Sequence, residues 1–348
     1  MLRIIIFIQN FGLIRLFLIF FAGVNSWTFF LYALDKHRAI KQKWRISEKT
    51  LLLFTLLLGG IGAFFAMTLI KHKNKKRKFK AAVVTGLIIC LIPMVHVIHS
   101  LTLDRIIQFV EIDFYADNWP TELNGYRIAF MTDFHTITDE DMAAVVLELN
   151  GRDLDLLLLG GDFADYVRTA PHYQGTVREI SQTVTTDGIF GVEGNHDNFE
   201  RLFEIKRRYG ITPLENNGYQ IREGFYLAGV RDLWNDEFAS IETAITDADF
   251  TDFILLVSHN PDIVMTQPTS NVDLVFSGHT HGGQITFFGY PFYLLRGSVT
   301  DYGTRFSHGF SYSEDGVPVF TSRGVGPYYN WPRIFARPEV VIFTMYAE

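Results

Sequence analysis

The second half of the chain alternates short apolar runs with amphipathic stretches, which is typical of an α/β domain. The strand-like runs are 126–132, 154–160, 188–192, 226–230, 253–257, 273–276, 317–321 and 340–344. The helix-like stretches between them are 139–150, 177–185, 199–209 and 239–246. Because the two kinds of element alternate, we expect helices to cover a largely buried sheet system.

The first hundred residues have a different pattern, with three stretches free of charged side chains. These stretches are 16–34, 50–70 and 81–103. Each is long enough to cross a bilayer. The middle stretch contains Gly59-Gly60-Ile61-Gly62, so two arrangements stay open for it: a full crossing, or a re-entrant hairpin. We therefore expect a membrane domain over 1–103, a tether over 104–123 and a catalytic domain over 124–348.

The charge of the chain is divided as sharply as its hydropathy. Residues 1–100 carry 15 Lys and Arg against 2 acids, a net +13, and the rest carries 16 against 36, a net −20. A basic, apolar first part followed by an acidic part indicates a membrane anchor with an exposed catalytic domain. An acidic domain is a poor match for the phosphate backbone, so we expect no nucleic-acid partner.

Two basic loops bear on orientation. The first, 35–49, contains six Lys or Arg, and the second, 71–80, contains seven. Arg105 is the one basic residue shortly after the third apolar stretch, against seven in the loop before it. The positive-inside rule therefore predicts a multi-pass protein of the cell membrane with an extracytoplasmic catalytic domain. If 50–70 crosses fully, the two loops lie on opposite sides; if it is re-entrant, both are cytoplasmic.

Polar groups that can bind metal ions follow the strand-like runs of the second half. They are Asp133 with His135, Asp162, Asn195 with His196, His259, and His279 with His281. In open α/β sheets, ligands bind at the carboxyl ends of the strands. Five of the seven histidines after residue 100 belong to this set, which makes a chance distribution a poor explanation.

The chemistry of these groups predicts a site for two divalent metal ions. Two ions about 3.5–4 Å apart need a carboxylate that touches both, and we assign that role to Asp162. A mixture of imidazole, carboxylate and amide favours Mn, Fe or Zn over Mg. The sequence has no Gly-x-Ser-x-Gly elbow for covalent acyl chemistry and no phosphate-binding glycine loop of a nucleoside-triphosphate motor. Its single cysteine, Cys90, lies in an apolar stretch, so we do not expect a thiol nucleophile.

The motifs of the second half resemble those of the calcineurin-like metallophosphoesterases, over about residues 124–346. The motifs are 133–135, 160–165, 194–197, 258–261 and 278–284. Segments 210–216 and 322–326 are similar to the membrane-associated YkuE and YaeI type within that family. The resemblance implies an α/β fold of two packed mixed β-sheets flanked by helices, here preceded by a helical transmembrane domain.

The resemblance also implies a role for each residue of the site. One metal ion would be held by Asp133, His135, Asp162 and His281, and the other by Asp162, Asn195, His259 and His279. His196 would be the catalytic histidine that protonates the leaving oxygen, with Asp197 beside it as a second catalytic residue. The family usually has Leu-Gly after the histidine of its first motif, whereas this chain has Thr136-Ile137-Thr138, so the loop on the substrate side departs from the family pattern.

We therefore expect a membrane-anchored phosphohydrolase with two metal ions that cleaves a phosphodiester, a pyrophosphate or a phosphomonoester. Attack by a metal-bridging hydroxide would need no protein nucleophile. The substrate, a phosphate ester, could be lipid-linked. The alternative is a non-catalytic membrane receptor or scaffold with a structural metal site.

For three further features the sequence leaves two interpretations open. The first part, around 32–36, 44–46, 58–60 and 72–76, resembles a small bacterial membrane domain of unknown function, which is either a plain anchor or a binding site for lipid or phosphate through its basic loops. The aromatic segments 287–295 and 328–331 either contact lipid or a partner, or pack on the core. His308 either contacts the substrate or is structural.

Overall fold

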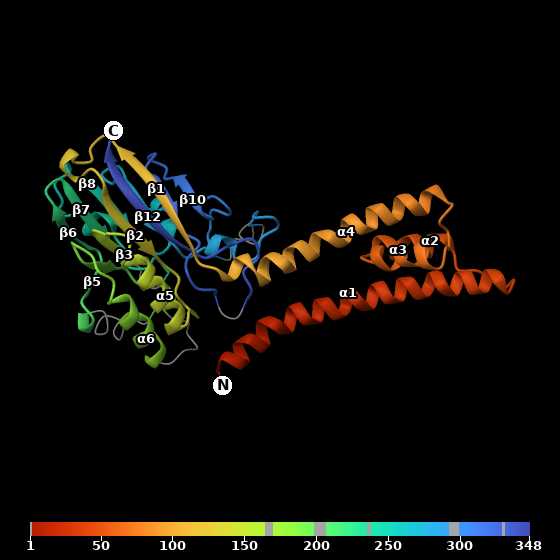
Figure 1. The fold of residues 1–348 in the computed structure, drawn as a ribbon. Coiled ribbons are helices and arrows are strands. Elements are labelled where there is room, and N and C mark those ends of the chain that lie inside the picture. The colour runs from red at the N-terminus through yellow and green to blue at the C-terminus, as the bar shows by residue number, and fades with distance from the viewer. Residues whose placement is uncertain (1, 164–169, 198–206, 235–237, 292–298, 329–330) are drawn as a thin grey trace. The chain divides into compact units, whose positions relative to one another are not determined.

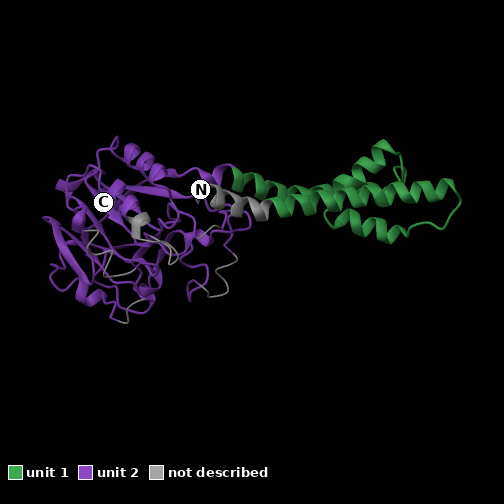
Figure 2. Ribbon diagram, turned by 90° about the horizontal axis from the view of Figure 1, so that it is seen from below, with its two compact units in different colours: residues 1–101 green, residues 102–348 purple. Residues whose placement is uncertain are grey.

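The computed structural model describes residues 2–163, 170–197, 207–234, 238–291, 299–328 and 331–348. The chain forms two compact units, residues 1–101 and residues 102–348 (Figure 2). The division lies close to the end of the membrane domain expected from the sequence.

The first unit is helical. It contains α1 (Leu2–Ile40), α2 (Glu48–Leu56), α3 (Gly60–Leu69) and α4 (Arg77–Leu101). By length and composition, two helical segments are candidates to cross a membrane: Arg15–Ile40 with 26 residues and Arg77–Arg105 with 29 residues. At 1.5 Å per residue each exceeds the hydrocarbon core of about 30 Å. The expected spans 16–34 and 81–103 fall inside these segments.

The third expected span, 50–70, is a pair of short helices. α2 has 9 residues and α3 has 10, and Leu58 between them has a φ of 61°, which a continuous helix excludes. Asn25 of α1 holds this break, because its amide nitrogen donates to the Leu58 carbonyl (2.9 Å) and its oxygen accepts from Gly62 N (2.9 Å). Each helix is about 15 Å long, too short to cross a bilayer by itself.

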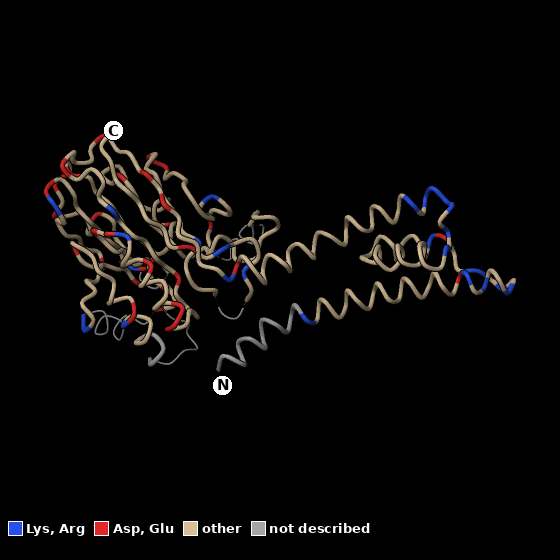
Figure 3. Tube along the Cα trace, viewed as in Figure 1, with Lys and Arg blue, Asp and Glu red and all other residues tan. Residues whose placement is uncertain are grey.

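The two basic loops of the first unit lie together at one end of it (Figure 3). Asp35 at the end of α1 is buried and accepts from Arg45 (2.6 Å), and its carboxylate lies 2.8 Å from the His72 ring. Lys73 in the second loop contacts Glu48 of the first loop (2.8 Å). Two acids, Asp35 and Glu48, thus join the loops.

The second unit contains two six-stranded sheets (Figure 1). The first has the order β1-β12-β2-β3-β4-β5, with β1 (Gln108–Ala116), β12 (Glu339–Ala347), β2 (Tyr126–Met131), β3 (Leu156–Leu159), β4 (Ile189–Gly191) and β5 (Ile211–Pro213). The second has the order β10-β11-β9-β8-β7-β6, with β10 (Gly309–Tyr312), β11 (Pro318–Thr321), β9 (Leu274–Ser277), β8 (Phe253–Val257), β7 (Phe225–Gly229) and β6 (Asn217–Arg222). Both sheets contain parallel and antiparallel pairs.

The helices cover the outer faces of the two sheets. A core that includes Phe130, Leu158, Leu255 and Phe276 joins strands of both sheets. α5 (Asp139–Leu149) and α6 (Ala170–Ile180) pack on the other face of the first sheet, and α8 (Ile241–Ala244) packs on the second. The predicted fold, two packed mixed sheets flanked by helices, is confirmed.

The expected tether is the main difference from the sequence analysis. Residues 108–116 form β1, which pairs with β12 in parallel along its whole length. Its alternating polar and apolar residues match a strand with one face on the core. The chain is already bound to the second unit before β1 begins, because the Asp104 carboxylate accepts a hydrogen bond from Phe335 N (2.9 Å).

Smaller differences concern short edge elements. β5, β6 and β10 were not expected from the sequence, and all three are edge strands with mixed exposure. α6 begins at residue 170 rather than 177. Most of the expected helix 199–209 lies outside the described residues.

Candidate metal centre

The candidate ligands lie at one edge of the two sheets. Asp133 follows β2, Asp162 follows β3, His259 follows β8, and His279 follows β9. Since β2 and β3 are parallel, as are β8 and β9, their carboxyl ends meet at this edge. Residues from four separate stretches of the chain are thereby brought to one place.

The backbone at this edge is held in unusual conformations. Five of the candidate ligands have a positive φ: Asp133 (56°), His135 (36°), Asp162 (56°), His279 (70°) and His281 (52°). Such a conformation costs about 1 kcal/mol or more for a residue with a side chain, and it clusters at functional sites. Gly161 allows the loops to approach, because a Cβ there would lie 2.5 Å from Gly194 N.

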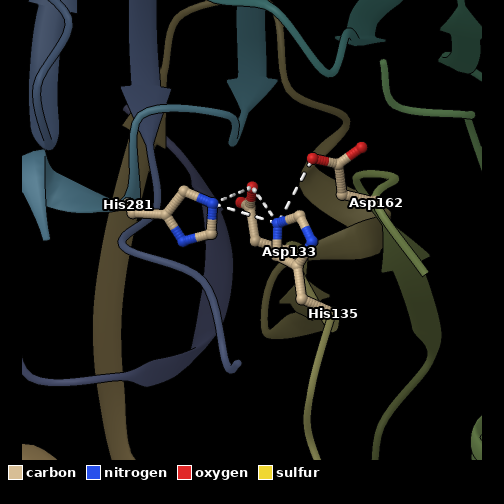
Figure 4. A group of neighbouring side chains, drawn as sticks. All are labelled: Asp133, His135, Asp162 and His281. Carbon is tan, nitrogen blue, oxygen red and sulfur yellow. Dashed lines mark hydrogen bonds and ion pairs between the residues drawn. The ribbon is translucent and has the colours of Figure 1, made fainter. Parts of the chain in front are cut away.

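The first group of ligands consists of Asp133, His135, Asp162 and His281, all buried (Figure 4). His135 Nε2 lies 3.3 Å from an Asp162 oxygen, and His281 Nε2 lies 3.3 Å from an Asp133 oxygen. The two Nε2 atoms of His135 and His281 are 3.0 Å apart. The ring nitrogens and the carboxylate oxygens thus converge on one small volume.

The second group consists of Asp162, His259 and His279, with Asn195 at its side. His259 Nε2 lies 3.2 Å from an Asp162 oxygen and 3.2 Å from the Asn195 side-chain oxygen. His279 Nδ1 lies 3.2 Å from the same His259 nitrogen. The other nitrogen of each ring contacts a backbone carbonyl: His259 Nδ1 lies 2.7 Å from the Gly160 oxygen, and His279 Nε2 lies 2.8 Å from the oxygen of residue 299. The nitrogen that faces the centre is therefore free of a proton and can bind a metal ion.

These separations fit two divalent ions. Neighbouring ligands of an octahedral ion at about 2.1 Å lie about 3.0 Å apart, and the closest donor atoms here are 3.0 to 3.3 Å apart. Asp162 belongs to both groups. Carboxylate, amide and imidazole donors are also what divalent transition metals bind.

The pKa shifts at the centre follow from the burial of these groups and from their closeness to one another. Burial lowers the pKa of His279 to about 3 and holds the pKa of His281 well below its usual value, so both rings are neutral, the form that binds metal. Burial acts to raise the pKa of Asp162, but the imidazoles of His259 and His135 outweigh it and hold that pKa below its usual range. Burial raises the pKa of Asp133.

His196 and Asp197 lie beside the ligands. The His196 ring centroid is 5.3 Å from that of His135, and His196 N donates to Asp162 (2.9 Å). The Asp197 carboxylate accepts from three backbone amides, those of Asp162 (2.8 Å), Phe163 (2.8 Å) and Gly194 (2.9 Å). Both of its oxygens therefore serve to hold the two loops that carry Asp162 and His196.

Three further side chains border the centre, and none of them was expected there from the sequence. The Tyr328 ring lies 5.4 Å from the His135 ring and 5.1 Å from the His196 ring, and the Trp234 ring meets the His279 ring edge-on at 4.6 Å. The buried Arg333 guanidinium lies 3.4 Å from His281 Nδ1. Tyr328 belongs to an aromatic segment that was noted, but no spacing rule connects it with the distant histidines.

Asn216 holds the loop next to the centre through three hydrogen bonds to backbone groups. Asn216 accepts from the backbone of Arg231 (3.2 Å) and Ser240 (3.0 Å) and donates to that of Phe238 (2.7 Å), which positions the loop that carries Trp234. His308 is in neither ligand group among the described residues; its ring lies 3.4 Å from the Ser307 hydroxyl.

Comparison with known proteins places the chain in a family. Residues 126–283 match the calcineurin-like phosphoesterases, and the uncharacterized metallophosphoesterase YkuE of Bacillus subtilis is 30% identical over 241 residues, which cover 65% of this chain and 81% of that protein. The chain belongs to the calcineurin-like phosphoesterase family. It is a metal-dependent phosphoesterase that acts on phosphate esters, and the predicted family is confirmed.

Other matches differ in how much they cover. A transmembrane protein with a metallophosphoesterase domain from Danio rerio is 25% identical over 255 residues, 67% of this chain and 56% of that protein. A dimetal phosphatase from Danio rerio has a solved structure that matches 58% of this chain and 88% of that chain, with 11% identity and a TM-score of 0.38. Residues 25–79 match a family described only as a protein of unknown function, DUF1294.

Proposed function

We propose that this phosphoesterase is anchored in a membrane and hydrolyses a phosphodiester, a pyrophosphate or a phosphomonoester with two divalent ions. One ion would be held by Asp133, His135, Asp162 and His281, and the other by Asp162, Asn195, His259 and His279. The observation that carries the proposal is the presence of two buried ligand groups that share Asp162. The donor set favours Mn, Fe or Zn.

The residues around the ions would divide the work of hydrolysis. When bound, two divalent ions lower the pKa of a coordinated water, orient the phosphoryl group and offset its charge. His196, beside the first ligand group, would donate a proton to the leaving oxygen. Asp197 would act as a positioning residue, because its carboxylate holds the backbone of the loops that carry Asp162 and His196.

The anchoring part of the proposal rests on α1 and α4. Both contain a segment long and apolar enough to cross a bilayer. With α2 and α3 as a hairpin, the two basic loops lie at one end of the unit and would share the cytoplasmic side. The catalytic unit, which follows α4, would then be extracytoplasmic. A fusion reporter after Glu348 that is active only outside the cytoplasm tests this orientation, and activity of a cytoplasmic reporter there would refute it.

A substitution of the shared ligand tests the catalytic part. In the full-length protein, Asp162→Ala should remove bound metal, measured by mass spectrometry, and abolish Mn²⁺-dependent hydrolysis of bis(p-nitrophenyl) phosphate. Glu242→Gln, an exposed acid on α8, is the matched control and should keep both. Wild-type protein that binds metal tightly but cleaves no phosphate ester would support the receptor or scaffold instead.

A further inference from the structure

A short aromatic hairpin stands out on the catalytic unit. Phe287, Phe288 and Tyr290 are 52%, 51% and 53% exposed. The backbones of Phe287 and Tyr290 bond to each other in both directions (3.0 Å), and Gly289 N donates to the Thr286 hydroxyl (2.9 Å). The turn is therefore closed by hydrogen bonds, and it exposes three aromatic side chains. Exposed apolar groups gathered in this way mark a contact surface.

The hairpin is fixed to the segment that enters the unit. Thr286 bonds to Ile334 through its backbone N–H (3.0 Å) and its hydroxyl (2.9 Å), and the Phe288 ring lies 5.3 Å from the Phe335 ring. Phe335 N in turn donates to the Asp104 carboxylate (2.9 Å). Residues 286–290 and residue 104 are thus joined through one short segment of chain.

Asp104 lies three residues beyond the end of α4. Three residues span at most about 10 Å. If α4 crosses a bilayer, the hairpin stays near the bilayer surface however the catalytic unit turns about this joint. Leu103 and Ile106, 45% and 54% exposed, extend the apolar character on the entering segment itself.

The metal centre lies at the same edge of the unit. β1 is parallel to β12, which is antiparallel to β2, so the start of β1 lies at the edge where β2 ends and Asp133 follows. Arg333, two residues before Phe335, contacts His281. The chain therefore enters the catalytic unit beside its catalytic centre rather than at the far end of the sheet.

We propose that Leu103, Ile106, Phe287, Phe288 and Tyr290 form a docking surface for the lipid–water interface, and that the centre takes phosphate esters whose apolar tails stay in the bilayer. This inference rests on the proposed membrane anchoring. Aromatic side chains with aliphatic neighbours are the groups that settle at that interface. Direct continuity with α4 favours lipid over a protein partner as the occupant.

Fluorescence quenching in nanodiscs tests the docking surface. The full-length protein would carry Cys90→Ser, which keeps a donor toward the Leu58 carbonyl, and one labelled cysteine at a time. Phe287→Cys probes the docking surface, and Phe250→Cys, 60% exposed and just before β8 at the opposite edge of its sheet, is the matched control. Val84→Cys on α4 reports whether that helix is in the bilayer.

Because interfacial groups insert about 5–10 Å into the headgroup region, spin-labelled lipid should quench the label at 287 at least about threefold more than the label at 250. Quenching at position 84 with equal quenching at 287 and 250 would overturn the docking surface while the anchoring stands. No quenching at position 84 would overturn both. Hydrolysis of soluble bis(p-nitrophenyl) phosphate by the same samples tests the catalytic proposal separately.

A second measurement addresses the substrate. Phe287→Ser should raise the KM for hexadecyl p-nitrophenyl phosphate held in the nanodisc about tenfold, the loss expected for one buried aromatic side chain. Turnover of soluble bis(p-nitrophenyl) phosphate should not change, and Phe250→Ser should change neither. An equal effect of Phe287→Ser on both esters would overturn the inference that the surface presents membrane-borne substrates.

Discussion

Replacement of Asp197 by Asn is the sharpest test of how the metal centre is held. The carboxylate accepts from three backbone amides, two of them at one oxygen. An Asn side chain can keep those two, but its NH₂ group then faces Phe163 N–H. The change loses one charge-assisted bond, about 1.5–3 kcal/mol, and weakens the other two. We expect Asp197→Asn to destabilise the catalytic unit by about 3 kcal/mol.

Thermal unfolding of the metal-loaded, full-length protein measures this effect. For a unit of this size, about 3 kcal/mol corresponds to a drop in Tm of about 6–12 °C. Metal affinity should fall as well, since Asp162 and Gly194 lie in the loops that Asp197 joins. Asp155→Asn is the matched control, because that carboxylate accepts one backbone amide, Arg127 N (2.8 Å), at the opposite edge of the sheet. A large loss of kcat with unchanged Tm and metal affinity would refute the positioning role and favour proton transfer by Asp197.

Three further predictions follow from the same edge of the fold. Gly161→Ala should lower Tm by at least about 5 °C and release metal, because the added Cβ would lie 2.5 Å from Gly194 N. Gly125 also has a positive φ but lies in open space, so Gly125→Ala should show only the cost of its backbone conformation, about 1–2 kcal/mol. Equal effects of the two substitutions would contradict the close approach of the loops. Removal of metal by a chelator should abolish hydrolysis and lower Tm, and added Mn²⁺ should restore both; activity that survives exhaustive chelation would exclude the proposed centre. Asn216→Ala should lower kcat/KM about tenfold through the loop that carries Trp234 while metal content stays constant, and a parallel loss of metal would show that Asn216 supports the ligands instead.

Much of the fold could be predicted from periodicity. The runs that became β2, β3, β8 and β9 are continuous and apolar because both faces of these strands are buried, so their place in the chain was visible without any structure. The polar groups directly after them stand out because each follows such an apolar run.

Other elements were hidden because their stability comes from distant partners. β1 is an edge strand, and among the described residues it pairs with β12, which lies more than two hundred residues later. Its alternating pattern by itself predicted only part of a tether. The break between α2 and α3 depends on Asn25 of α1, which a single apolar run cannot reveal; the run itself allowed both a crossing and a hairpin.

The sequence by itself determined the class of fold, the two-part organisation and the residue types of a two-metal centre, because burial and metal coordination each demand particular side chains at particular places along a strand. Only the tertiary structure decided how closely the ligands of the two groups approach one another, that Asp197 binds backbone amides, and that the chain enters beside the centre. These are contacts between residues far apart in the chain. Their geometry is set by strand order and loop conformation, and local sequence carries no record of either.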